Sequence, residues 1–278
     1  MTTTATTTAT TKTKAKAKAK KKAKKKTAPP TPGFRAALAF EWTKFASLRS
    51  TRWTLLVTGA LTVVGAVFVG LSGSLQPDDT VLGGSLTLSV VSLMVAGTVG
   101  ALTMCGEYAS GTITATLTAV PRRRRVLAAK ATLLACLLYA TGLVSCTVAY
   151  LLGGAVLEDG TYAQGEPMPA LLGIAGLFAL VGLIGLAGGT LLKHSAGAVV
   201  TVVGVLLLPS LFGPLLGDLQ RWVAGATPTA ALEKLTQTSD ASPETVGSLG
   251  AWPSLGLVAA YTLLLLGAAG WRLQRRDA

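Results

Sequence analysis

The sequence contains few charged residues and few of the residue types that build soluble active sites. Only 13% of its 278 residues are charged, whereas a soluble domain carries roughly 25%. It has one histidine and three cysteines, and the cysteines show no CxxC spacing. We therefore expect neither a disulfide scaffold nor a metal site.

The few charges are also strongly segregated along the chain. Long apolar stretches with no Asp, Glu, Lys or Arg alternate with short segments that hold all the charge. A soluble core does not separate its charges in this way, so a soluble enzyme and a wholly disordered chain are excluded. The six charge-free stretches are 53–75, 85–105, 131–157, 170–192, 196–216 and 255–271.

The length of these stretches predicts membrane-spanning helices. About 20 helical residues cross a hydrocarbon core of about 30 Å, and the stretches are rich in Leu, Val, Ala and Gly. The short alternating strands of a β-barrel are not visible. We predict an all-α membrane protein with six transmembrane helices; five helices, with one stretch wrongly split, is the main alternative.

The distribution of basic residues predicts the orientation. With the N-terminus inside, 23 of the 25 Lys and Arg residues fall in inner segments and 2 in outer loops. Such a bias places both termini in the cytoplasm. We expect the protein in the cell (plasma) membrane.

Residues 1–33 form a Lys- and Thr-rich segment of low complexity. This composition cannot build a core, so we expect a disordered cytoplasmic tail. Its ten lysines favour membrane lipid as a partner, because each basic residue near an anionic leaflet contributes about 1 kcal/mol. Nucleic acid is the alternative, but no aromatic residue lies among the lysines, so no specific nucleic-acid partner is expected.

A short amphipathic pattern follows the tail. Apolar side chains recur at spacings of three and four in 34–52, and basic residues occupy much of the rest. The pattern predicts an interfacial helix that leads into the first span; a simple extension of that span is the alternative. The apolar positions are Phe34, Leu38, Trp42, Phe45 and Leu48.

Small, hydroxyl and proline residues mark two of the spans. Ser85, Ser89 and Ser92 share one face of the second span, and Pro209 and Pro214 predict a bent outer end in the fifth. Close helix packing and the lining of a substrate path are both compatible with the serines.

No motif for catalysis or nucleotide hydrolysis is present. The sequence has no HExxH, no GxxxxGK[ST] and no carboxylate pair within a span. We expect no enzyme activity and no bound cofactor.

The inner segment between the second and third spans has an unusual pattern. Glu107 ends the second span, Ser110 and Gly111 break the helix, and an uncharged apolar stretch runs to Pro121 before four arginines. An apolar segment held there is typical of a docking site for a soluble partner.

This segment resembles the inner loop of the ABC type-2 permease family, the six-helix membrane subunits of ABC exporters. The similarity covers about 34–278 and includes the opening EWTKFASLRSTRWT and the closing RLQRRDA. The resemblance implies a coupling helix at 111–120 that fits a separate ATP-binding subunit, a pathway at a homodimer interface, and re-entrant helices in 217–254. The residues that it places at the coupling site are Glu107, Gly111, Thr112, Leu117, Pro121, Arg124 and Lys130.

The predicted function is therefore the membrane subunit of an ATP-driven exporter. The charge-free spans favour an amphipathic or lipid-like substrate over a small ion. One rival is an ion-coupled secondary transporter, which usually carries ionisable residues within its spans. The other is a non-transporting membrane scaffold that acts through its polybasic tail.

Overall fold

The computed structural model describes residues 33–73, 75, 78–113, 116, 123–157, 162–213, 215, 217, 220–238 and 241–275, with backbone only at 221, 244 and 245. The described residues form helices and no strand, apart from one isolated bridge between Thr80 and Ala163. Six helical segments in this part of the chain are long and apolar enough to cross a membrane. They are α3 (Arg49–Ser72), α4 with α5 (Val81–Leu86 and Ser89–Ala109), α7 (Arg123–Val156), α8 (Pro167–Leu192), α9 (Ser195–Phe212) and α13 (Ala251–Arg275).

The observed helices confirm the six predicted spans, and most are longer than the charge-free stretches. The third begins at Arg123, because the arginines and Lys130 continue the helix beyond its apolar part. The second runs on through Glu107. The fifth ends at Phe212, three residues after Pro209, instead of reaching 216.

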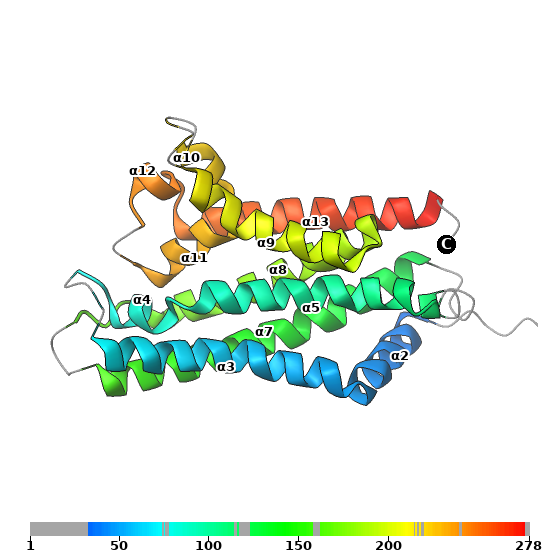
Figure 1. Ribbon diagram of the computed structural model, residues 1–278, viewed down its shortest axis with the longest axis horizontal. Coiled ribbons are helices and arrows are strands. Elements are labelled where there is room, and N and C mark those ends of the chain that lie inside the picture. Colours follow the sequence, from blue (N-terminus) through cyan, green and yellow to red (C-terminus); the bar gives the residue numbers. More distant parts are fainter. Residues whose placement is uncertain are drawn as a thin grey trace, which may run out of the picture. The chain divides into compact units, whose positions relative to one another are not determined.

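The shorter helices lie at the two ends of the bundle (Figure 1). α2 (Phe34–Ser47) lies at the same end as the C-terminal end of α13; we call this the α2 end. At the opposite end α4 lies near three short helices, α10 (Gln220–Val223), α11 (Pro228–Thr236) and α12 (Pro243–Val246), with a 3-10 turn at Ala224–Ala226.

The first helix is shorter than the predicted 34–52. Leu48 has an extended backbone, with φ −87° and ψ 107°, which separates α2 from α3. α2 turns Ala37 and Glu41 inward and leaves Phe34 and Trp42 exposed. An exposed aromatic face agrees with the predicted position in the membrane interface, which stays a prediction.

At the end of the bundle opposite α2, hydrogen bonds join segments that lie far apart in the sequence. The Val81 N–H donates to the Ala163 carbonyl at 2.9 Å. The Glu166 N–H donates to Gln237 Oε1 at 3.1 Å, and Gln237 Nε2 donates to the Glu166 carbonyl at 3.3 Å. These bonds join the start of α4, the segment before α8 and the end of α11 into one unit.

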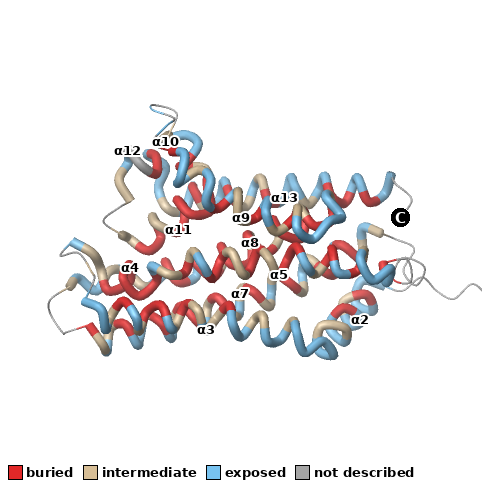
Figure 2. The backbone as a smooth tube through the Cα atoms, in the orientation of Figure 1, coloured by how far each residue is buried: buried red, intermediate tan, exposed pale blue. Residues whose placement is uncertain are grey.

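α8 is the central helix of the bundle. In its most apolar part 83% of the residues are buried, against 28% for α3 and α13 and 17% for α9. It packs against α5, α7, α9, α11 and α13. In Figure 2 exposed residues alternate with buried ones along α13, as expected for a helix with one face against the bundle.

Glycines allow α5 and α8 to approach backbone to backbone. A methyl group at Gly100 would overlap the Gly182 carbonyl oxygen, and one at Gly185 would overlap the Gly97 carbonyl oxygen. Small residues permit such contacts in lipid, where helix association depends on close packing. The glycine-rich fourth span is therefore a packing surface.

We predict that Gly185→Ala destabilises the protein and that Gly188→Ala does not. The added methyl at 185 meets main-chain atoms that cannot move independently, and overpacking of this kind costs at least about 1–3 kcal/mol. At Gly188 a methyl group meets no atom within 4 Å. Thermal unfolding of the purified variants, followed by tryptophan fluorescence, gives the comparison; equal midpoints would contradict the proposed contact.

Candidate functional site

The segment after α5 leaves the helix through a turn of defined geometry. The Ser110 hydroxyl donates to the Gly106 carbonyl at 2.7 Å and lies 2.9 Å from the Thr112 hydroxyl. Gly111 has φ +68°, a left-handed conformation that favours glycine. The Ser110-Gly111 pair therefore ends the helix as the sequence predicts.

Helical backbone resumes directly after this turn. Thr112, Ile113 and Thr116 are helical, and the Thr116 hydroxyl donates to the Thr112 carbonyl at 3.0 Å. Ile113 and Thr116 are both 4% exposed, so this part of the segment packs against the bundle. Leu117 and Pro121, the other predicted loop residues, lie outside the described residues.

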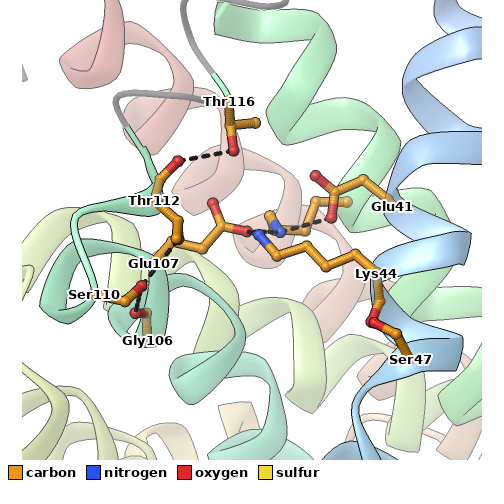
Figure 3. A network of polar contacts seen from close by, with 9 residues as sticks. Glu41, Lys44, Ser47, Gly106, Glu107, Ser110, Thr112 and Thr116 are labelled. Carbon is orange, nitrogen blue, oxygen red and sulfur yellow. Dashed lines mark hydrogen bonds and ion pairs between the residues drawn. The ribbon is translucent and has the colours of Figure 1, made fainter.

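A cluster of four charged side chains lies beside this segment (Figure 3). Lys130 donates to Glu41 Oε2 at 2.7 Å and to Glu107 Oε1 at 2.6 Å. Lys44 donates to the same Glu107 oxygen. We call Glu41, Lys44, Glu107 and Lys130 the charged cluster.

Three helices supply the charged cluster. Glu41 and Lys44 lie one turn apart on α2, Glu107 lies in the last turn of α5, and Lys130 lies in the second turn of α7. The side chains of Glu41, Glu107 and Lys130 are 3–5% exposed, and that of Lys44 is 26% exposed. The cluster therefore holds α2 against the base of the segment that follows α5.

The chemistry of the cluster is structural. Both carboxylates are ion-paired with lysines, and the described residues contain no group of His, Cys, Asp and Glu that could hold a metal ion. A buried ion pair contributes little net stability, but removing one partner leaves an uncompensated charge at a large cost. The cluster thus fixes one arrangement of three helices.

Two arginines at the start of α7 have other surroundings than the buried, ion-paired Lys130. Arg124 is exposed, whereas Arg123 donates to the Leu273 carbonyl at 3.0 Å. That bond links the start of α7 to the end of α13.

Glu41, Lys44 and Arg123 belong to this site although the sequence does not predict them. The available signal was Glu41 itself, a carboxylate within an otherwise apolar and basic helix.

The three serines that were candidates for a pathway are buried within the helix bundle. Ser85, Ser89 and Ser92 are at most 2% exposed. The Thr62 hydroxyl of α3 donates to Ser92 Oγ at 2.8 Å, and Ser85 contacts Gly153 of α7. Within a single chain these serines therefore contribute to packing between helices.

Of the two prolines predicted to bend the fifth span, one lies among the described residues. Pro209 is half-buried within α9, and Pro214 lies outside the described residues.

We predict that Lys130→Met is strongly destabilising and that Glu41→Met restores much of the loss. The single change leaves the buried Glu41 carboxylate without its lysine, at a cost of about 3–5 kcal/mol. In the double variant Glu107 still pairs with Lys44. Unfolding midpoints of the two variants provide the measurement. If the double variant is no more stable than Lys130→Met, the uncompensated charge is not the cause.

Comparisons with known proteins agree with the architecture. Residues 3–278 match the model of a family described as ABC-2 family transporter protein. No curated protein and no solved structure matches the chain. A match over nearly the whole chain, together with six membrane-crossing helices, shows that the chain belongs to the ABC-2 transporter family and is a membrane-spanning permease subunit.

Proposed function

We propose that this chain is the permease subunit of an ATP-driven exporter in the plasma membrane, coupled to a separate ATP-binding subunit. The observation that carries the proposal is the family match over residues 3–278. The segment that begins at Gly111 is the proposed docking point for the ATP-binding subunit. It is the segment to which the charged cluster fixes α2.

The charged cluster supports a route for coupling. Closure of an ATP-binding subunit would push on the segment after α5, and Glu107 sits four residues before Gly111 at its base. Lys130 and Lys44 join Glu107 to α7 and α2, so these helices move with it. A ligand-driven change needs contacts that differ between two states, and we place those contacts at this segment. Glu107 and Lys130 are buried, so their proposed role in coupling is exerted through their own helices.

We propose that two copies of the chain pair in the transporter. Only 17% of the residues in the apolar part of α9 are buried, and Val200 and Leu211 are about 70% exposed. This face would lie against a second copy or against lipid. The proposed pathway then runs between copies, near α5 and α9.

The proposed cargo is amphipathic or lipid-like. The six charge-free stretches hold no ionised side chain, and the buried charges lie on α2, in the last turn of α5 and near the start of α7. The same absence speaks against the ion-coupled alternative, because such transporters usually hold ionisable residues near the bilayer midplane.

We predict that Gly111→Val uncouples ATP hydrolysis from transport and that Gly111→Asn does so much less. A β-branched residue at φ +68° is strained, whereas asparagine tolerates the left-handed region. A Cβ atom added there meets no described atom within 4 Å, so a clash at the Cβ does not account for the difference. Substrate-stimulated ATPase activity of the reconstituted complex is the measurement. Normal coupling in Gly111→Val would place the docking point elsewhere.

We predict that deletion of residues 1–33 leaves transport coupled to ATP hydrolysis. The compact unit is Phe34–Ala278, so the deletion removes none of the described helices. A scaffold that acts through its ten lysines would instead lose its function. Transport by the truncated chain, with proton-gradient dependence measured in parallel, separates the exporter from both rivals.

A further inference from the structure

The last turns of α5 have a second face, which lies against α8 and α9. Ala101, Cys105 and Tyr108 follow one another at spacings of four and three, so they share one side of the helix. Ala101 and Cys105 are buried in a cluster with Ala198 of α9. The Cys105 thiol donates to the Gly189 carbonyl of α8, with 3.7 Å between sulfur and oxygen. This face therefore contacts the end of α8 and the start of α9.

The turn between α8 and α9 is held to the same end of α5. It consists of two residues, Lys193 and His194. The Lys193 N–H donates to the Gly189 carbonyl at 3.0 Å, which ends α8. The His194 Nδ1 atom accepts from the Gly197 N–H at 3.2 Å, which caps α9. The Lys193 ammonium lies over the Tyr108 ring, 4.9 Å from its centroid, so a cation–π contact joins the turn to α5.

The backbone of Lys193 indicates that its side chain is needed at this position. Lys193 has φ 56°, a left-handed conformation in which helices usually end on glycine. In the described part of the chain the other non-glycine residue with positive φ is Gln237, and its side chain donates to the Glu166 carbonyl. An unfavourable backbone conformation persists where the surrounding structure compensates for it. The contact with Tyr108 provides this compensation at Lys193.

Tyr108 also belongs to the turn at which the proposed docking segment begins. The Gly111 N–H donates to the Tyr108 carbonyl at 3.3 Å. The main chain of Tyr108 therefore forms this turn while its ring contacts Lys193. A displacement of the segment that moves Gly111 consequently moves the Tyr108 ring. Chains of hydrogen bonds and packed side chains of this kind can carry coupling between distant sites.

We infer that Tyr108 and Lys193 are positioning residues that transmit movement of the docking segment to the turn between α8 and α9. The inference rests on the proposed function and adds a second route to it. The charged cluster connects the base of the segment to α2 and α7. The contact between Tyr108 and Lys193 connects it to the central helix α8 and to α9, the helix proposed to lie near the pathway.

Hydrogen exchange in the complete transporter tests this inference. The chain is purified with its ATP-binding subunit in nanodiscs. Amide exchange of peptides 106–113 and 192–198 is then measured by mass spectrometry with and without a non-hydrolysable ATP analogue, as a ratio within each variant. In the unmodified chain we expect the analogue to change exchange in both peptides. In Lys193→Gly we expect the change at 106–113 to persist and the change at 192–198 to fall about two- to fivefold, the size of one cation–π contact.

Conservative variants separate this role from a purely structural one. Lys193→Arg keeps a cation that stacks on an aromatic ring, and Tyr108→Phe keeps the ring, so both should respond as the unmodified chain does. Tyr108→Leu removes the ring and should behave like Lys193→Gly. In Lys193→Gly the lost contact and the relieved backbone affect stability in opposite directions, so its unfolding temperature should change little.

The two peptides distinguish failure of the inference from failure of the proposed function. A full response at 192–198 in Lys193→Gly, with 106–113 also responding, overturns the inference and leaves the docking segment in place. No response at 106–113 in the unmodified chain refutes the docking segment and the inference together. If Lys193→Gly does not fold, the comparison of Tyr108→Leu with Tyr108→Phe decides by the same criterion.

Discussion

The position of α2 depends on one buried lysine that bridges two carboxylates. Lys130 is 3% exposed and contacts Glu41 of α2 and Glu107 of α5 while it belongs to α7. Charges removed from water are tolerated only with all their partners in place. α2 therefore cannot tilt away from the bundle without leaving a carboxylate unpaired, and the same holds for the last turn of α5. The start of the short segment that begins at Gly111 is held in place as well, because Gly111 lies only four residues after Glu107.

The two ends of the bundle are held by different forces. At the end opposite α2, neutral hydrogen bonds join Val81 to Ala163 and Gln237 to Glu166. At the α2 end, ion pairs hold the helices together. Between them, α5 and α8 meet at glycines, where no side chain separates the main chains. A permease built in this way can change shape by shifting whole helices, since its central contact offers no soft side chains to absorb a displacement.

The sequence predicted the six spans because apolar length is a local property that needs no knowledge of neighbours. The break at Ser110 and Gly111 was equally local, since glycine is the residue that adopts the observed left-handed backbone. The charged cluster was not predicted, because Lys130 and Glu41 lie 89 residues apart and no periodicity connects them. Likewise, helical spacing predicted that Ser85, Ser89 and Ser92 share one face of their helix. It could not predict that this face packs against α3 and α7. Several observed helices extend beyond the predicted ends of the spans. Charged residues such as Lys130 can continue a helix once they form ion pairs.

The electroneutrality of the charged cluster affects how the protein responds to membrane voltage. Moving one elementary charge through a potential of 100 mV changes its energy by about 2.3 kcal/mol. Glu41, Lys44, Glu107 and Lys130 carry no net charge together, so a displacement of the four as a unit does no electrical work. Displacement of this unit therefore draws no energy from the membrane potential, unlike displacement of any one of its four charges alone.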